Sequence, residues 1–82
     1  MRIDKFLNST NITKRRSIAQ DMIKNQVVLI NDRIVKSSKN VEVEDVITIN
    51  YLEFTKKYKV LKIPTVKSTP KSTQEEYIKN LK

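Results

Sequence analysis

Apolar residues near the start of the chain recur at the spacing of a helix. Ile3, Phe6 and Leu7 are three and four residues apart, which predicts a short amphipathic helix. Arg2 and Lys5 fall outside its apolar stripe, so both basic side chains are expected to face solvent.

A second helix is predicted over residues 14–25. The preceding residues, 8–13, are rich in Asn, Ser and Thr, which favours a turn, and Thr13 is a candidate N-cap. The apolar face of this helix consists of Ile18, Ala19, Met22 and Ile23. That face is expected to pack into the core, so that the two helices form a helix-turn-helix-like pair.

The middle of the chain alternates short β-branched runs with turn residues. The predicted strands cover residues 27–30, 33–36, 46–50 and 58–63. Asn31 and Asp32 suit a tight type I′ turn between the first two strands, and residues 54–57 are predicted as a hairpin loop between the last two. Two or three helices packed on a small antiparallel sheet make an α+β fold.

The alternation of short β-branched runs and turn residues ends after Ile63. Pro64 and Pro70 interrupt a stretch of Lys, Ser and Thr. Residues 64–82 are therefore interpreted as a flexible basic tail that follows a folded domain over residues 1–63. The sequence Ser72-Thr73-Gln74-Glu75 resembles a capping box, so one or two helical turns in the tail remain an alternative.

The amino-acid composition excludes several kinds of catalytic and metal-binding site. The 82 residues include no Cys, no His and no Gly. Thiolate zinc sites, disulfides, histidine-activated nucleophiles and glycine-rich phosphate loops are thereby excluded. The Asp residues are scattered without metal-ligand spacing, so we expect a non-catalytic protein with no metal and no cofactor. No signal peptide or membrane-spanning run is evident, and a cytoplasmic monomer that does not bind membranes is expected.

The net charge of the chain points to a polyanion as a candidate partner. Lys and Arg total 17 against 9 Asp and Glu, a net charge of +8. Residues 1–36 carry 8 basic and 3 acidic side chains, residues 37–53 carry 1 and 4, and residues 54–82 carry 8 and 2. Basic ends of this kind attract polyanions such as nucleic acid, although solubility alone would also explain the total.

The strongest candidate site is the run Lys14-Arg15-Arg16 at the start of the second helix. Cations are unfavourable at the positive end of the helix dipole, so their placement there indicates a function. Together with Ser17 and the free backbone N–H groups they suit a phosphate, and Arg2 and Lys5 add charge if the two helices share a surface. A solvated charged turn is the alternative.

Two other segments carry weaker indications. Lys36-Ser37-Ser38-Lys39 alternates amines with hydroxyls that suit sugar and phosphate oxygens, although an ordinary polar loop is the simpler interpretation. The aromatic residues are few, and they show no platform for stacking single-stranded bases. Folded RNA, recognised by shape and phosphate, is favoured over single strands.

The order of these blocks resembles the S4 RNA-binding domain, which is named after a small-subunit ribosomal protein. The blocks are Arg2-Ile3-Asp4-Lys5-Phe6-Leu7, Lys14-Arg15-Arg16-Ser17-Ile18-Ala19, Val28-Leu29-Ile30-Asn31, Lys36-Ser37-Ser38 and the stretch from Val41 to Ile47. They cover about residues 1–50. With no enzymatic domain attached, the chain is similar to the stand-alone group that includes heat-shock protein fifteen and ribosome-associated quality-control factor P.

The resemblance implies an α+β fold that binds rRNA and tRNA through its helix-turn-helix surface. It also implies binding to the large ribosomal subunit when a stalled peptidyl-tRNA remains there. The residues it assigns to RNA are Arg2, Lys5, Lys14, Arg15, Arg16, Asn31 and Lys36. Gln26, Asp32 and Glu44 stand where the family usually has Gly, which leaves the loop conformations open.

Three other functions compete with this interpretation. One is an rRNA-binding ribosome assembly factor, another an adaptor for acidic proteins or membrane surfaces, and the third the RNA-binding part of an rRNA-modifying enzyme. The adaptor would need a long amphipathic helix with bulky apolar residues, which the sequence does not show. The modifying enzyme would need a catalytic domain, for which 82 residues leave no room.

Overall fold

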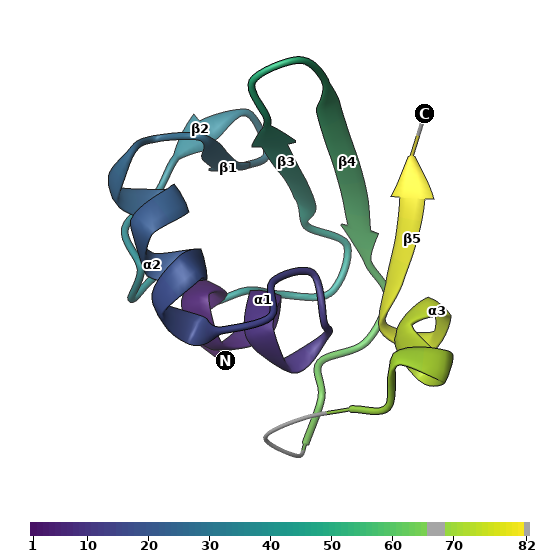
Figure 1. Ribbon diagram of the computed structural model, residues 1–82. Coiled ribbons are helices and arrows are strands. Elements are labelled where there is room, and N and C mark those ends of the chain that lie inside the picture. Colours follow the sequence, from purple (N-terminus) through teal and green to yellow (C-terminus); the bar gives the residue numbers. More distant parts are fainter. Residues whose placement is uncertain (66–68, 82) are drawn as a thin grey trace.

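A computed structural model describes residues 1–65 and 69–81 of the chain and has an α+β architecture (Figure 1). In chain order the elements are α1 (Ile3–Ser9), α2 (Arg16–Lys24), β1 (Val28–Ile30), β2 (Arg33–Ile34), β3 (Val46–Asn50), β4 (Thr55–Val60), the 3-10 helix η1 (Lys71–Thr73), α3 (Gln74–Tyr77) and β5 (Ile78–Leu81). The five strands form one antiparallel sheet in the order β2-β1-β3-β4-β5. The predicted fold class, helices packed on a small antiparallel sheet, is confirmed.

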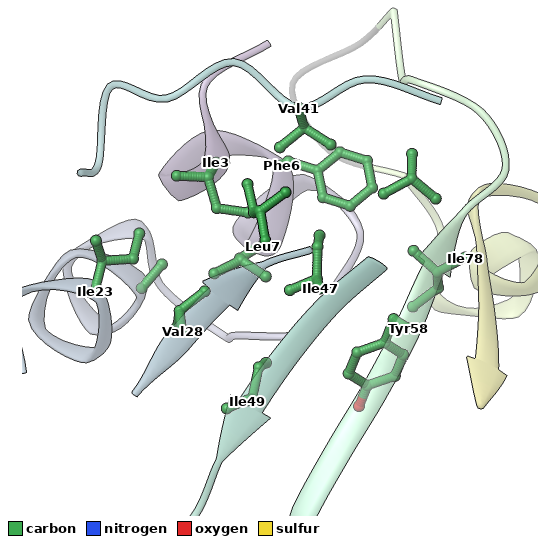
Figure 2. Packing of buried hydrophobic residues seen from close by; sticks show 13 residues of the cluster. Ile3, Phe6, Leu7, Ile23, Val28, Val41, Ile47, Ile49, Tyr58 and Ile78 are labelled. Carbon is green, nitrogen blue, oxygen red and sulfur yellow. The ribbon is translucent and has the colours of Figure 1, made fainter. Parts of the chain in front are cut away.

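The hydrophobic core lies between the helices α1 and α2 and one face of the sheet (Figure 2). Its buried members are Ile3, Phe6 and Leu7 of α1, Ala19 and Ile23 of α2, the strand residues Val28, Ile30, Ile47, Ile49, Tyr58, Val60 and Ile78, and Val41. The apolar stripe predicted for the first helix is therefore the centre of the core. Its burial supplies the main driving force for packing the two helices on the sheet.

The second helix begins later than predicted. Thr13 does not cap it, because the Thr13 hydroxyl donates to the carbonyl oxygen of Arg15 at 3.1 Å. The backbone of Arg15 is extended, and the helix starts at Arg16. Lys14 and Arg15 thus precede the helix instead of forming its first turn.

Within residues 1–65 and 69–81, five non-glycine residues have a positive φ, a conformation that favours glycine. Asn31 (52°) and Asp32 (65°) form the turn between β1 and β2, as the predicted type I′ turn requires. Gln26 (61°) and Glu44 (80°) also have this conformation, and Asn11 (64°) follows α1. At each of these positions the Cβ atom makes the left-handed conformation less favourable by about 1–2 kcal/mol. The loops therefore keep glycine-type conformations at some expense of stability.

The hairpin between β3 and β4 is longer than predicted. Residues 54–57 were expected to form its loop, but β4 already begins at Thr55, which pairs with Asn50. The strand reads Thr-Lys-Lys-Tyr-Lys-Val, and its Lys side chains obscured the alternation that buries Tyr58 and Val60. A strand with one solvated face can carry this many charges.

The prediction of a flexible tail over residues 64–82 is wrong for residues 69–81. β5 pairs with β4 along its length, and Ile78 is 3% exposed. η1 and α3 supply the helical turns that were the alternative, although no side chain caps either of them. A single well-buried apolar residue in a polar stretch gave too weak a pattern to predict a strand. Residues 66–68 and 82 lie outside the part of the chain that the structure describes.

Polar contacts also tie this segment to the end of α1. The backbone N–H and the hydroxyl of Thr69 both donate to the carbonyl oxygen of Ser9, at 3.1 and 2.8 Å. The side chain of Gln74 donates to the carbonyl oxygen of Thr10 at 2.7 Å. These bonds satisfy carbonyl groups that the end of a helix leaves without intrahelical partners.

Replacing Ile78 with Ala is expected to lower the free energy of unfolding by about 2–4 kcal/mol, because it opens a cavity where β5 meets the core. Urea denaturation of the full chain measures this difference. The exposed neighbour Lys79, changed to Ala, is the control and is expected to shift stability by about 0.5 kcal/mol or less. Equal stabilities for both variants would mean that β5 is detached in solution.

Candidate nucleic-acid interface

A buried carboxylate lies where α1 and α2 meet. Asp4 is in the first turn of α1 and is 0% exposed. Its Oδ1 accepts a hydrogen bond from the backbone N–H of Lys5 at 2.8 Å, and its Oδ2 accepts one from Nε2 of Gln20 on α2 at 3.0 Å. A buried charge must be paired and hydrogen-bonded, and here the bond from Gln20 links the two helices.

Two arginine side chains, Arg2 and Arg16, converge on this carboxylate; we call them the arginine pair. Nε of Arg2 is 3.3 Å from Oδ1 of Asp4, and Nε of Arg16 is 3.2 Å from Oδ2. The two arginine side chains remain 47% and 43% exposed. A guanidinium has five N–H donors, so each arginine keeps donors for a further acceptor. The single carboxylate of Asp4 is paired with two guanidinium groups, so the cluster has a net positive charge, and its exposed side chains are the two arginines.

The pKa of Asp4 reflects this environment. Burial by itself raises the pKa of the carboxyl. Hydrogen bonds from Gln20, Arg16 and the N–H of Lys5, together with the charge of Arg16, outweigh burial and hold the pKa below its ordinary value. Asp4 is therefore ionised at neutral pH and can orient both arginines.

Three more of the basic residues predicted to bind RNA lie on or next to the same two helices. Lys5 lies on α1, and the exposed Lys14 and Arg15 lead into α2. No side chain caps the start of α2, and no acidic residue lies in its first turn. The positive end of this helix is thus open to an anion. We call Arg2, Lys5, Lys14, Arg15 and Arg16 the helical site.

The remaining two predicted residues lie apart from these five. The side-chain oxygen of Asn31 accepts from the N–H of Val46 at 3.0 Å, and its nitrogen donates to Asp45 at 3.1 Å. The amide of Asn31 therefore braces the β1–β2 turn. Lys36 is exposed and lines, with Asn31, an open pocket of about 780 Å³ that also contains Arg33.

The loop that follows Lys36 is fastened to the start of α1. The N–H of Ile3 donates to the carbonyl oxygen of Lys39, and the N–H of Val41 donates to that of Met1, both at 2.8 Å. The backbone of Arg2 is bridged to Asn40 between them. This pairing fixes the backbone from which the side chain of Arg2 extends.

The sequence patterns did not reveal Asp4 or Gln20 as part of the site. Asp4 was grouped with the scattered acidic residues, yet it lies beside the apolar stripe of α1, one residue after Ile3 and three before Leu7. That position, close to Arg2 and to the run of basic residues at 14–16, was the available signal for a buried ion pair. Gln20 gave none.

The described residues show neither of two other kinds of site. They contain no group of three or more His, Cys, Asp or Glu side chains that could hold a metal ion. Within residues 1–65 and 69–81, every helix is too short and too polar to cross a membrane.

Comparison of the sequence with known proteins gives consistent matches. The family model described as the S4 domain matches residues 1–47. Two relatives from Helicobacter pylori are called RQC P-site tRNA stabilizing factor. The one from strain J99 is 44% identical over 78 residues, and the one from strain 26695 is 41% identical. Each match covers 95% of this chain and 93% of the relative.

Two solved structures are also similar to this chain. The trimeric structure of Vibrio cholerae heat shock protein 15 matches with a TM-score of 0.89 and 26% identity, over 99% of this chain and 81% of that one. The solution structure of the hypothetical protein HP1423 matches with a TM-score of 0.87 and 39% identity, over 100% and 98%. The family model covers the helical site and its supporting carboxylate, and the relatives span almost the whole length, so this chain belongs to the S4 domain family.

Proposed function

We propose that this protein is a non-catalytic binder of structured RNA that acts on the large ribosomal subunit, where it helps to hold a stalled peptidyl-tRNA. The observation that carries the proposal is the arginine pair fixed on one buried carboxylate. The name of the two Helicobacter pylori relatives, which describes stabilisation of a P-site tRNA, supports the same role for this chain.

The geometry suits recognition of an RNA backbone. Arg2 and Arg16 are oriented before any ligand arrives, so less side-chain entropy is lost on binding. Guanidinium groups bind phosphate through paired hydrogen bonds, and the open start of α2 adds a favourable dipole. Double-stranded RNA is recognised mainly by shape and by contacts with its phosphates and hydroxyls. We assign the phosphate contacts to the helical site.

Asn31 and Lys36 have different parts in this proposal. Lys36 is exposed at the open pocket and supplies an outer phosphate contact. Asn31 acts indirectly, because both polar atoms of its side chain already hold the β1–β2 turn in place. All five residues of the helical site belong to one chain, so we propose that the active form is a monomer. The proposed ribosomal role places it in the cytoplasm.

The affinity for structured RNA is expected to fall steeply with salt. About 4–6 phosphate contacts give a slope of roughly −3 to −5 in a plot of log affinity against log salt concentration. Fluorescence anisotropy with a labelled tRNA or rRNA fragment, measured from low to moderate salt, determines this slope. A slope near zero would exclude binding through phosphates.

A further inference from the structure

Two aromatic rings stack at the tip of the β3–β4 hairpin. The ring centroids of Tyr51 and Phe54 are 4.7 Å apart, with 26° between the planes. Phe54 is 54% exposed, and Leu52 between them is 102% exposed. The sequence pattern showed no platform for stacking bases, and the hairpin turn brings these two rings together.

The tip is held rigidly. The hydroxyl of Thr55 donates to the side-chain oxygen of Asn50 at 3.0 Å, where the two strands begin to pair. Tyr51 is half-buried and its pKa is raised by that burial, so the sheet anchors the inner ring of the stack. Phe54 consequently presents a supported ring to solvent instead of collapsing onto the core.

Positive charge adjoins the exposed ring. Lys56 and Lys57 follow Phe54 after Thr55, on opposite faces of β4, and both are exposed. Among the residues that the structure describes, neither lysine takes part in an ion pair. Glu53 is the one acid in the turn. An aromatic face beside unpaired cations suits a nucleotide, since the ring can stack on a base while the amines meet its phosphates. An apolar protein partner would gain nothing from the two lysines.

We infer that the hairpin tip binds an unpaired RNA base, with Phe54 stacking on the base and Lys56 and Lys57 contacting the adjoining phosphates. This inference rests on the proposed function, because it adds a second contact to the same class of ligand. The tip lies at the opposite end of the molecule from α1 in Figure 1, so one RNA could touch both surfaces only by spanning the protein. The helical site would then bind folded RNA while the tip binds a loop or bulge.

The test is a titration of the isotopically labelled full chain with short single-stranded oligoadenylate, followed by amide NMR shifts. We expect shifts at residues 51–57. Phe54→Ala should abolish them and weaken oligoadenylate binding by about tenfold, whereas Phe54→Trp should retain them. Leu61→Ala, at an apolar side chain 39% exposed just beyond β4, is the matched control and should bind normally.

The results of this titration distinguish failure of the stacking site from failure of the proposed RNA-binding function. If oligoadenylate shifts only the amides of the helical site, or if Phe54→Ala binds it as the wild type does, the stacking site is overturned and the proposed function stands. If neither oligoadenylate nor a structured tRNA shifts any amide, both are overturned. Because the ring of Phe54 is largely exposed, its variants are expected to fold, and the unperturbed signals of the core confirm this in the same spectra.

Discussion

Replacing Arg2 and Arg16 together with Gln is expected to lower the affinity for structured RNA by about 100-fold or more. Each arginine contributes a charge-assisted hydrogen bond to phosphate, worth about 1.5–3 kcal/mol. Gln is preferred to Glu because a carboxylate at position 16 would lie against the buried Asp4 and would disturb the fold. Gln can still donate a hydrogen bond to Asp4. Anisotropy titrations with a labelled tRNA at constant salt measure the loss.

The matched control removes the same amount of charge elsewhere. Lys71 and Lys79 are both exposed, on η1 and β5, and neither belongs to the helical site. Changing both to Gln should weaken RNA binding only slightly. If the two double variants lost affinity equally, total charge would be the determinant and the arginine pair would have no special role.

Replacing Asp4 with Asn is expected to weaken RNA binding by about tenfold, even though the protein becomes more positive. Removing an acid from a protein that binds a polyanion should strengthen binding if charge alone matters. Here the carboxylate orients Arg2 and Arg16 with one oxygen facing the Nε of each, whereas an amide is neutral and keeps only one accepting oxygen, so it cannot orient both. The loss corresponds to about 1.4 kcal/mol of lost preorganisation. The same titration with labelled tRNA provides the measurement.

The control for Asp4→Asn is Glu75→Gln, which makes the same change of charge at an exposed residue of α3. It should leave RNA affinity unchanged or raise it slightly. Asp4→Asn is also expected to lower the free energy of unfolding by about 1–3 kcal/mol, because it removes buried charge-assisted bonds. Binding is therefore measured at a temperature where circular dichroism shows the variant folded. An affinity that rises as it does in Glu75→Gln would contradict the orienting role of Asp4.

The parts of the fold that local patterns determine could be predicted. The spacing of Ile3, Phe6 and Leu7 predicted α1, and the alternation around the Asn31-Asp32 turn predicted the β1–β2 hairpin. α1 buries residues at a regular helical period, and β1 and β2 pair with each other across a tight turn. Sequence spacing is therefore sufficient to find them.

The elements that depend on distant partners were missed. β5 is polar apart from Ile78 and Leu81, and it is a strand because β4 supplies its hydrogen-bond partners. The buried position of Asp4 likewise depends on Arg16 and Gln20, which reach it only once α1 packs on α2. Single-sequence patterns carry little information on such pairings.

The basic residues of the candidate site stand out in the sequence, which also favours Arg16 as the dominant contact, with Arg2 behaving alike. From the sequence pattern, Lys14, Arg15 and Arg16 were all placed in the first turn of the second helix. In the structure only Arg16 is joined with Arg2 on a buried carboxylate, and Lys14 and Arg15 are exposed and precede the helix. We therefore expect the arginine pair to dominate binding.

Sedimentation through a sucrose gradient tests the central claim most directly. Tagged full-length protein is mixed with large ribosomal subunits that either carry a peptidyl-tRNA or are empty, and the fractions are probed for the tag. We predict that the protein comigrates with the large subunits, more strongly when peptidyl-tRNA is present, and that the Arg2→Gln/Arg16→Gln variant stays at the top of the gradient. Wild-type protein that remains at the top with both kinds of subunit would contradict the claim.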